Sequence, residues 1–196
     1  MNGIADKSLS LVLIGGSSGS FVIFEDILKL LRSPISFALI FVLHRGKSSL
    51  SVLPDLFKSK TDVFMSEPHH LDTIEPNSVY FAVPDYHLLI GNDYRFYFDV
   101  SQPDFFSRPS INATFISAAQ SGIPVKAAML FSGSSPDGAA GMQMLAEMGV
   151  PTYVQNPDFA EFPRMPQEAL LKNQNHKLLP KTNFYKTISD ILYSIN

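Results

Sequence analysis

The first third of the chain alternates between short apolar runs and a segment with helical spacing. Apolar residues fill 11–14 and 37–43, while residues 20–32 carry apolar side chains at intervals of three and four. A short continuous apolar run is typical of a strand buried on both faces, and the spacing between the runs is typical of an amphipathic helix. The pattern therefore predicts strands over 10–14 and 37–43, joined by a helix into a right-handed βαβ unit of a parallel sheet.

The middle of the chain departs from this alternation. Short runs of β-prone residues lie at 78–83, 87–90 and 94–98, and Gly91-Asn92-Asp93 separates the last two. Gly, Asn and Asp tolerate the positive φ angles of tight hairpin turns. We therefore expect an antiparallel hairpin here, at the edge of the sheet.

The last half returns to alternating helices and strands. Helix-start signals, namely Ser110 after Arg108-Pro109 and the segment Pro166-Gln167-Glu168, precede patterns with helical spacing. The elements expected are a helix over 110–121, a strand over 125–131, a helix over 138–148, a strand over 151–155, a helix opened by residues 166–168 and a helix over 183–194. The predicted fold class is therefore α/β: a doubly wound, mostly parallel sheet with helices on both faces and an antiparallel edge hairpin.

Length and composition fit one compact unit. The chain has 196 residues, of which 45% are hydrophobic and 17% are charged, enough apolar material for one substantial core. We therefore expect a single domain over residues 1–196. The formal net charge is -3 and Lys and Arg do not cluster, so the sequence predicts no nucleic acid partner and no attraction to an anionic membrane.

Cysteine is absent from the chain, which excludes disulfides, thiolate nucleophiles and cysteine-based metal sites. This composition fits the reducing cytoplasm, where we expect the protein to act. No apolar stretch approaches the ~18 residues of a membrane span, so we expect no membrane insertion. The apolar run after Lys7 has some features of a signal peptide, but cleavage there would remove the first predicted strand and Ser17.

Three polar residues follow predicted strands. Ser17 lies in a Gly-Gly-Ser-Ser-Gly turn after the first strand, His44 ends the second, and Asp137 follows the strand over 125–131. Loops at the carboxyl ends of parallel strands meet at one edge of the sheet, so these residues can converge. Serine, histidine and aspartate are the nucleophile, the base and the orienting group of a serine hydrolase. The chain order Ser, His, Asp differs from that of the α/β-hydrolases.

Each part also has a simpler interpretation. The turn around Ser17 can be a plain strand-to-helix connection, or a phosphate-binding loop at a helix N-terminus. A lone histidine such as His44 is commonly a hydrogen-bonded residue at the edge of a sheet. Asp137 follows Ser135-Pro136 and has the pattern of a helix start, with Pro at the first position and an acid in the first turn.

Other residues extend the hydrolase hypothesis. The backbone N–H of Ser18, directly after the nucleophile, is where an oxyanion donor is expected. His87 competes with the first histidine for the role of base, and it can instead line the pocket or simply belong to the hairpin. A metal-dependent mechanism is disfavoured because His69, His70 and Asp72 lack a further ligand at a suitable spacing. We therefore expect neither a cofactor nor a metal.

An ordered series of motifs resembles the catalytic domain of the bacterial chemotaxis protein-glutamate methylesterases, the CheB family. The matching segments are residues 14–19, 43–45, 76–84 with His87, 108–112, 132–142, 155–156 and 165–169. They look like the nucleophile loop, the histidine loop, the central hairpin region, the Arg-Pro-Ser helix start, the aspartate loop and the closing segment of that family. Several matches in a fixed order are far more specific than one G-x-S-x-G turn.

The resemblance implies hydrolysis of γ-glutamyl methyl esters, and in some members deamidation of glutamine, on the helical signalling bundles of chemoreceptors. In this interpretation Ser17 attacks the ester carbonyl, His44 relays the proton to methanol and then activates water, and Asp137 orients His44. A methylated chemoreceptor or a similar helical signalling protein is the implied partner. The backbone N–H of Ser134 is the candidate for a second oxyanion donor.

The chain departs from the family pattern at several positions. Ser20 stands where a second glycine is usual, Ser134-Ser135-Pro136 replaces a typical Met-Gly-Asn, and Asn112 replaces an acidic residue. Pro136 removes one backbone N–H from the loop that would supply the second oxyanion donor. The phosphorylation receiver domain usual in the family is expected to be missing, because the first predicted catalytic strand begins near residue 10.

Two other functions remain open at this point. A protein of the same fold that has lost efficient turnover would act as a regulatory or binding module, which the Pro136 loop favours. An esterase or amidase of this type could also act on a protein other than a receptor, because recognition of a protein surface leaves no spacing pattern in a sequence. Reaction with a serine-directed fluorophosphonate separates an active enzyme from a binding module.

Overall fold

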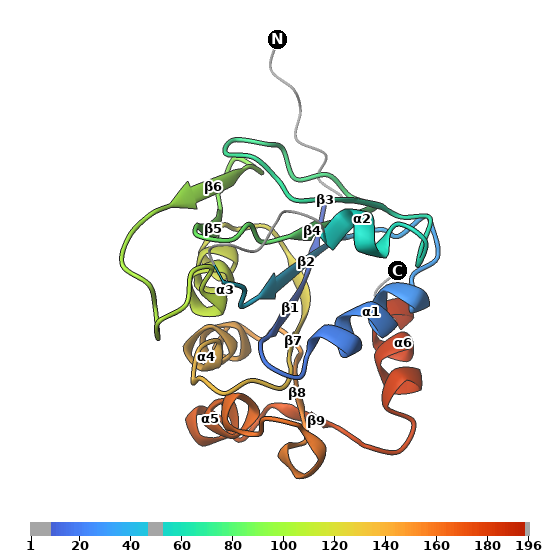
Figure 1. Ribbon diagram of the computed structural model, residues 1–196, viewed down its shortest axis with the longest axis vertical. Helices are drawn as coiled ribbons and strands as arrows, with labels where there is room; N and C mark the ends of the chain where they lie inside the picture. Colours follow the sequence, from blue (N-terminus) through green and yellow to red (C-terminus); the bar gives the residue numbers. More distant parts are fainter. Residues whose placement is uncertain (1–8, 47–52, 195–196) are drawn as a thin grey trace.

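The computed structural model describes residues 9–46 and 53–194 of the chain. Figure 1 shows the succession of helices and strands along it. In chain order the elements are β1 (Leu11–Gly16), α1 (Phe21–Leu30), β2 (Ala38–Leu43), α2 (Leu53–Phe57), β3 (Phe64–Ser66), β4 (Ser78–Phe81), β5 (His87–Ile90), β6 (Phe96–Asp99), α3 (Ile111–Gln120), β7 (Val125–Leu130), α4 (Ala139–Glu147), β8 (Thr152–Gln155), the 3-10 helix η1 (Pro157–Phe159), α5 (Arg164–Lys172), β9 (Lys177–Leu179) and α6 (Phe184–Ser194).

Seven strands form one sheet in the order β3-β4-β2-β1-β7-β8-β9, and all its neighbouring strands pair in parallel. β1 lies in the middle, with β2 on one side and β7 on the other. The chain therefore builds one half of the sheet, returns past β1 and builds the other half, which is the arrangement of a doubly wound fold. The predicted fold class is confirmed.

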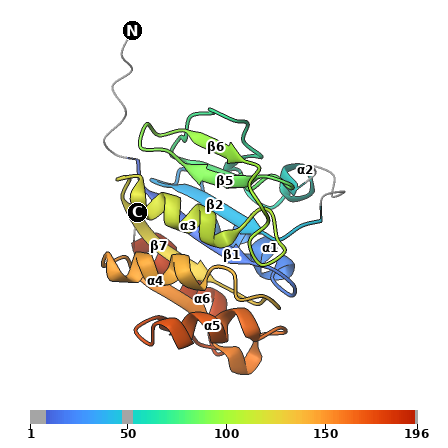
Figure 2. The same ribbon diagram turned by 90° about the vertical axis from the view of Figure 1, so that its left-hand side faces the viewer.

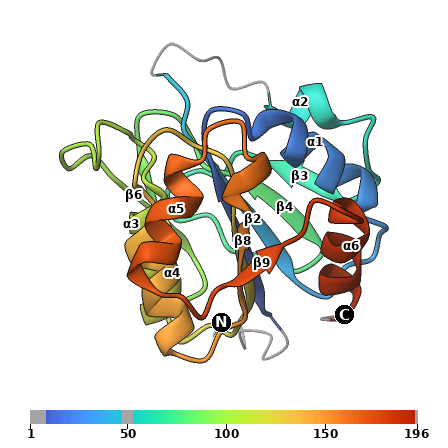
Figure 3. The ribbon, with the colours of Figure 1, turned by 90° about the horizontal axis from the view of Figure 1, so that it is seen from below.

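Helices cover both faces of this sheet. Figures 1 and 3 show α3, α4 and α5 on one face and α1 and α6 on the other, where the buried residues of α2 also pack. Successive side chains of a strand point to opposite faces. Leu11 and Leu13 of β1 therefore join the core beneath α3, whereas Val12 and Ile14 join the core beneath α1. Burial on both faces explains why the strand sequences are uninterrupted apolar runs.

The antiparallel hairpin is present, but it forms a sheet of its own and does not extend the edge of the large sheet. Among the described residues, β5 and β6 pair only with each other. Leu88 and Phe96 are buried in the core on the α3 side, and Figure 2 shows the hairpin above α3. The run at 78–83 supplies β4, which is a parallel strand between β3 and β2. All four residues of β4 are buried, which its position inside the sheet explains.

The sequence does not predict four short elements: α2, β3, η1 and β9. Each has only three to five residues. Segments of this length contain too few residues to establish a hydrophobic period. β3 and β9 lie at the two edges of the large sheet, so their conformation depends on the strands beside them.

No helix among residues 9–46 and 53–194 is long and apolar enough to cross a membrane. The longest helix described is α6, with 11 residues, whereas a membrane-spanning helix needs about 20. The apolar side chains of α6 pack into the core, where Ile188 and Leu192 are buried.

Candidate active site

The loop that carries Ser17 is a tight turn between β1 and α1. The backbone N–H of Ser17 donates to the carbonyl of Ser132 over 2.9 Å, and its own carbonyl accepts from the N–H of Ser20 over 3.0 Å. Gly19 completes the turn with a φ of 80°, a left-handed conformation that glycine adopts readily. These contacts fix the backbone on both sides of Ser17, while the residue itself stays partly exposed.

Ser20, where the resemblance leads us to expect a glycine, fits because Gly16 has no side chain. A Cβ atom on Gly16 would lie 2.5 Å from Oγ of Ser20, which is too close for any side chain there. The buried Ser20 hydroxyl donates to the carbonyl of Ser132 over 2.7 Å. Because Ser132 precedes the loop that carries Asp137, this hydrogen bond joins the Ser17 loop to the Asp137 loop.

His44 lies directly after β2 and presents one ring nitrogen to Asp137. Its backbone N–H donates to the carbonyl of Gly16, which places it beside the Ser17 loop. Nε2 of His44 lies 2.7 Å from Oδ2 of Asp137. The side chain of His44 is 9% exposed, and that of Asp137 is fully buried. Since a carboxylate only accepts hydrogen bonds, this contact assigns the ring proton to Nε2 and leaves Nδ1 as the acceptor nitrogen.

The side chain of Asp137 lies at the N-terminus of α3. Three backbone N–H groups donate to it over 2.7–2.9 Å, those of Ile111, Asn112 and Gly138. The first N–H groups of a helix have no partner within the helix and interact favourably with a negative charge. The sequence analysis places Asp137 at the start of the helix that follows it, α4. Its side chain contacts that helix start through Gly138, but it accepts more hydrogen bonds from the start of α3. The same contacts hold its Oδ2 against His44.

His87 does not reach this arrangement directly. Its ring is buried; Nδ1 accepts from the backbone N–H of Ser110 over 3.1 Å, and Nε2 lies 3.1 Å from the carbonyl of Gln102. Backbone groups thus occupy both nitrogens. The expectation that His87 lines the pocket is not met, because the hairpin turns this ring toward the start of α3. It supports Ser110, whose hydroxyl lies 3.1 Å from Asp137.

Ser17 and His44 line the same cavity, which has a volume of about 420 Å³. The other described residues that line it are Phe105, Phe106, Ser107, Ser134, Ser135, Pro136 and Arg164. Among these described lining residues, Arg164 at the start of α5 carries the one permanent charge. The cavity therefore combines the hydroxyl group of Ser17, the imidazole of His44, which contacts the buried Asp137 carboxylate, and the cation of Arg164.

The two backbone groups expected to bind an oxyanion lie close to Ser17. Ser134 lines the cavity, and Ser18 is the next residue along the turn. Within the part of the chain that the structure describes, neither backbone N–H has a hydrogen-bond partner. An unpartnered N–H beside a nucleophile is suited to receive a developing negative charge. Pro136 also lines the cavity. It has no backbone N–H, but the two expected donors belong to Ser18 and Ser134 and are unaffected by this proline.

Ser107 contacts His44, and the sequence analysis does not predict this contact. Oγ of Ser107 lies 3.1 Å from Nδ1 of His44, the nitrogen left to accept a proton. Between described residues, the hydroxyl of Ser17 makes no hydrogen bond with either ring nitrogen. Ser107 belongs to a loop without hydrophobic period, so only the tertiary structure reveals its position.

Asn112 connects this loop to two helices. Its Oδ1 accepts from the backbone N–H of Gly141 in α4 over 3.0 Å. Its Nδ2 donates to Oδ2 of Asp104 over 3.2 Å. A carboxylate at position 112 could donate neither to Asp104 nor to any other acceptor. The amide of Asn112 can therefore make a contact with Asp104 that an ionised acid at this position could not make.

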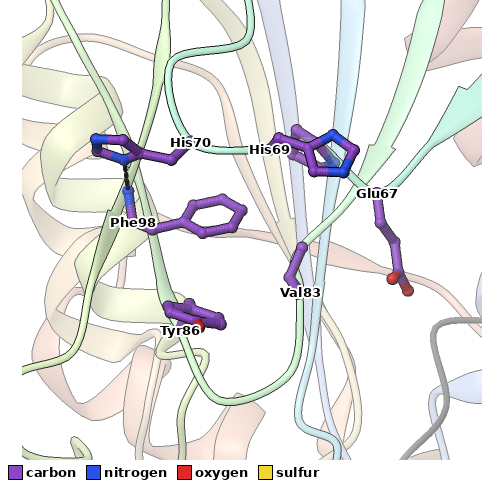
Figure 4. A pocket seen from close by; sticks show the side chains of 7 residues that line it. Glu67, His69, His70, Val83, Tyr86 and Phe98 are labelled. Atoms are coloured by element: carbon purple, nitrogen blue, oxygen red, sulfur yellow. Dashed lines mark hydrogen bonds between the residues drawn. The ribbon is translucent and has the colours of Figure 1, made fainter.

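A larger cavity, of about 690 Å³, lies beside the hairpin and includes His69 and His70. Figure 4 shows the two rings on different sides of it. Nδ1 of His70 accepts from the backbone N–H of Phe98 over 3.0 Å, and His69 lies 3.3 Å from Asp72. The two histidines do not converge. No set of three His, Cys, Asp or Glu side chains that could hold a metal ion occurs within residues 9–46 and 53–194.

Comparisons with known proteins point to one family. The profile of the CheB methylesterase family matches residues 12–188. A "Putative protein-glutamate methylesterase/protein-glutamine glutaminase" of Leptospira interrogans is 30% identical over 159 residues, 81% of this chain and 82% of that protein. "Protein-glutamate methylesterase/protein-glutamine glutaminase 2" of Methanospirillum hungatei is 25% identical over 187 residues, 94% of this chain. The chain spans 53% of the length of the Methanospirillum protein.

A solved structure has the same fold. The crystal structure of the Thermotoga maritima CheB methylesterase catalytic domain matches with a TM-score of 0.82, covering 92% of this chain and 97% of that one. The two sequences are 20% identical, so this likeness concerns the fold. The profile match extends over most of the chain and concerns the family. The chain therefore belongs to the CheB methylesterase family.

Proposed function

We propose that this protein hydrolyses glutamate methyl esters on a helical signalling protein of the chemoreceptor type, with Ser17 as the nucleophile, His44 as the base and Asp137 as the group that orients the base. The observation that carries the proposal is the 2.7 Å contact between Nε2 of His44 and the buried Asp137 carboxylate, at a cavity that also contains Ser17. A histidine held in one tautomer beside a serine hydroxyl is suited to nucleophilic catalysis.

Acylation begins when Oγ of Ser17 attacks the ester carbonyl carbon and Nδ1 of His44 takes the hydroxyl proton. Nδ1 is the base because Nε2 faces Asp137, the reverse of the chymotrypsin arrangement, in which the carboxylate holds Nδ1. The backbone N–H groups of Ser18 and Ser134 donate hydrogen bonds to the oxyanion of the tetrahedral intermediate. Its collapse breaks the bond to the methoxy oxygen, and His44 returns the proton so that methanol leaves.

Deacylation repeats these steps with water. His44 takes a proton from water while the water oxygen attacks the glutamyl ester of Ser17, and the same N–H groups donate hydrogen bonds to the oxyanion. His44 then returns the proton to Ser17 as the glutamate side chain leaves. With a glutamine side chain, the first step would release ammonia in place of methanol. The two relatives are named for both reactions, and we propose deamidation as a second activity of this site.

The substrate class follows from the names of the relatives and from the charge beside the cavity. Their names specify glutamate and glutamine within proteins. The side chain of Arg164 is 63% exposed, and its ion pair with Glu168 has a long N–O distance of 4.0 Å. An exposed pair of this kind contributes little by itself, so Arg164 remains able to attract acidic groups. A helix with further glutamates near the methylated one is the substrate that suits this charge.

Release of labelled methanol from a methylated chemoreceptor fragment tests the proposal. The protein should release methanol, the Ser17→Ala variant should release none, and a fluorophosphonate should label only the protein with Ser17 intact. Labelling without methanol release would show a reactive Ser17 and would mean that the substrate is an ester other than the chemoreceptor methyl ester. Absence of labelling both in the well-folded protein and in its Ser107→Ala variant would overturn the enzymatic proposal in favour of a regulatory module of the same fold.

A further inference from the structure

Ser107 occupies the nitrogen that the proposed reaction requires. Nε2 of His44 faces Asp137 at 2.7 Å, so Nδ1 is the acceptor, and the hydroxyl of Ser107 lies 3.1 Å from it. The lone pair on Nδ1 lies in the ring plane and accepts one hydrogen bond. Ser17 can therefore transfer its proton to His44 only after the hydroxyl of Ser107 has left Nδ1.

A turn of unusual composition holds Ser107 in this position. Asp104 and Ser107 exchange two backbone hydrogen bonds, of 2.8 and 3.1 Å. The residues between them, Phe105 and Phe106, have φ angles of 45° and 65°. Positive φ at both central positions is the type I′ geometry, which favours Asn-Gly and disfavours bulky residues. The closed turn therefore carries a conformational cost, which makes its displacement easier.

The start of the turn is anchored, and its tip is exposed. The carboxylate of Asp104 lies 3.0 Å from Oγ of Ser110 and 3.2 Å from Nδ2 of Asn112, both at the start of α3. Phe106 at the tip has a relative exposure of 102%, and Phe105 has 45%. An aromatic side chain with no protein surface around it is available to a partner. Asp104 is thus attached to α3, and Arg108 after the turn is paired with Asp85. Displacement of Ser107 therefore requires its two backbone hydrogen bonds with Asp104 to open, which movement of the exposed tip would allow.

The turn borders two cavities. One, of about 420 Å³, contains Ser17, and the other has a volume of about 300 Å³. His44, Phe106 and Ser107 line both of them. The turn and His44 therefore border both cavities. The smaller cavity can receive Ser107 when the turn is displaced.

We propose that residues 104–107 form a gate on the catalytic base: Ser107 holds Nδ1 of His44 in the resting protein, and displacement of the turn frees Nδ1 for Ser17. The exposed ring of Phe106 is the part of the turn that a docking protein substrate would contact. This inference rests on the proposed function, since it takes Ser17 as the nucleophile and His44 as the base. Ser107 is a positioning residue in this scheme, because it acts only through His44.

The rate of labelling by a small fluorophosphonate tests the gate without any protein substrate. In this reaction Oγ of Ser17 bonds to phosphorus, fluoride leaves, and His44 takes the hydroxyl proton. Ser107→Ala should label about 2- to 13-fold faster than the unchanged protein, the factor that corresponds to the loss of one net hydrogen bond of about 0.5–1.5 kcal/mol. Ser107→Thr keeps a hydroxyl and should restore the slower rate.

Ser101→Ala is the matched control for loosening of the loop. The hydroxyl of Ser101 donates to Asp99 and lies outside the cavity lining. Its loss should leave the labelling rate unchanged. A slower or equal rate in Ser107→Ala would overturn the gate. A faster rate in Ser101→Ala would do the same, because loosening alone would then account for the effect.

A double substitution at the tip of the turn distinguishes two effects on the labelling rate: the stability of the closed turn, and the access of the reagent to the cavity that Phe105 and Phe106 line. Phe105→Asn with Phe106→Gly supplies the residues that a type I′ turn prefers, so the closed turn should become more stable and labelling about tenfold slower. The same pair of changes in the Ser107→Ala background measures access alone and should not slow labelling. Equal effects in both backgrounds would contradict the gate, since the coupling between the tip and Ser107 would be zero.

The two proposals fail in different ways. If neither the unchanged protein nor Ser107→Ala is labelled, the proposed function fails. If the unchanged protein is labelled at Ser17 but removal of the Ser107 hydroxyl does not accelerate the reaction, the function stands and the gate is wrong. Faster labelling that depends on this hydroxyl supports both.

Discussion

The two nitrogens of His44 face regions of opposite character. On the Nε2 side, Asp137 is fully buried and is held by three backbone N–H groups. On the Nδ1 side, the contact is a single serine hydroxyl at 3.1 Å, carried by a turn whose tip is fully exposed. One side is built into the start of a helix packed on the sheet. The other side is a two-residue turn in an unfavourable backbone conformation.

The difference separates two tasks of a catalytic histidine. Orientation of the ring requires a partner that does not move, and buried backbone groups around Asp137 supply it. Proton exchange with the nucleophile requires that the other nitrogen change partners during the reaction. A weak contact on a displaceable turn satisfies this second requirement. Changes at Ser17 and around Asp137 are expected to have the larger effects, and the Ser107 variants test the turn.

The largest effect is expected from Ser17→Ala, which removes the proposed nucleophile. Ester hydrolysis should fall by at least ~10³-fold. The hydroxyl of Ser17 has no hydrogen-bond partner among the described residues, so its loss should leave the urea midpoint nearly unchanged. Rates and urea unfolding should be measured on the same preparation. A well-folded variant with near-normal activity would move the nucleophile elsewhere.

Asp137→Asn should weaken the contacts that hold Nε2 of His44. An amide cannot accept from all the donors around it, so turnover should fall on the order of 10²–10³-fold because the ring is no longer held in one tautomer. A buried donor left without a partner should also lower the free energy of unfolding by about 1–3 kcal/mol. Asp104→Asn, on the turn, is the matched control and should have a smaller effect on both. Equal effects would mean that the two sides of His44 do not differ in rigidity.

Ser110→Ala tests how the rigid side is supported. Oγ of Ser110 accepts from the N–H of Ala113 as the N-cap of α3 and lies 3.1 Å from Asp137. Removal of such a cap should lower the free energy of unfolding by about 1 kcal/mol and reduce turnover modestly. Urea unfolding and steady-state kinetics measure the two effects. Ser110→Thr keeps the capping oxygen and should restore both; failure to do so would show that the cap is not the cause.

The smallest effect concerns His176, a buried histidine without a carboxylate partner. Its Nδ1 lies 2.7 Å from Oγ1 of Thr152, and burial lowers its pKa below 6.5. The unfolded chain therefore binds this proton more readily, so stability should be complete above pH 6.5 and fall as the pH drops toward the lower folded pKa. The loss is at most about 1.4 kcal/mol per pH unit. Urea midpoints at pH 7.5 and 5 should differ less in His176→Gln; an unchanged difference would exclude His176 as the source.

The order of the longer strands and helices and the three catalytic candidates could be predicted from the sequence. A strand buried on both faces can be recognised from its own sequence, without knowledge of the neighbouring strands, because burial selects apolar residues at nearly every position. β1, β2 and β7 are examples. Residues directly after such strands are then placed at one edge of the sheet by topology alone. This reasoning located Ser17, His44 and Asp137 on converging loops, and the structure brings them together.

Other features depend on contacts between distant segments. The run at 78–83 has the composition of a hairpin strand, and its place between β2 and β3 is decided by pairing with those strands. His87 has the same chemistry as His44, but backbone groups of Ser110 and Gln102 occupy both of its nitrogens. Neither outcome has a local signal, because hydrogen-bond partners far along the chain determine it.

The sequence by itself determined the α/β architecture and the position of Ser17, His44 and Asp137 directly after strands, since hydrophobic burial and loop position leave local patterns. Only the tertiary structure decided which helix start receives the Asp137 carboxylate, which nitrogen of His44 it holds, and that Ser107 contacts the other one. These are matters of direction and distance between side chains on separate loops. Their physical reason lies in the packing of α3 on one face of the sheet and in the contacts of the 104–107 turn with His44 and the start of α3, which no periodicity along the chain records.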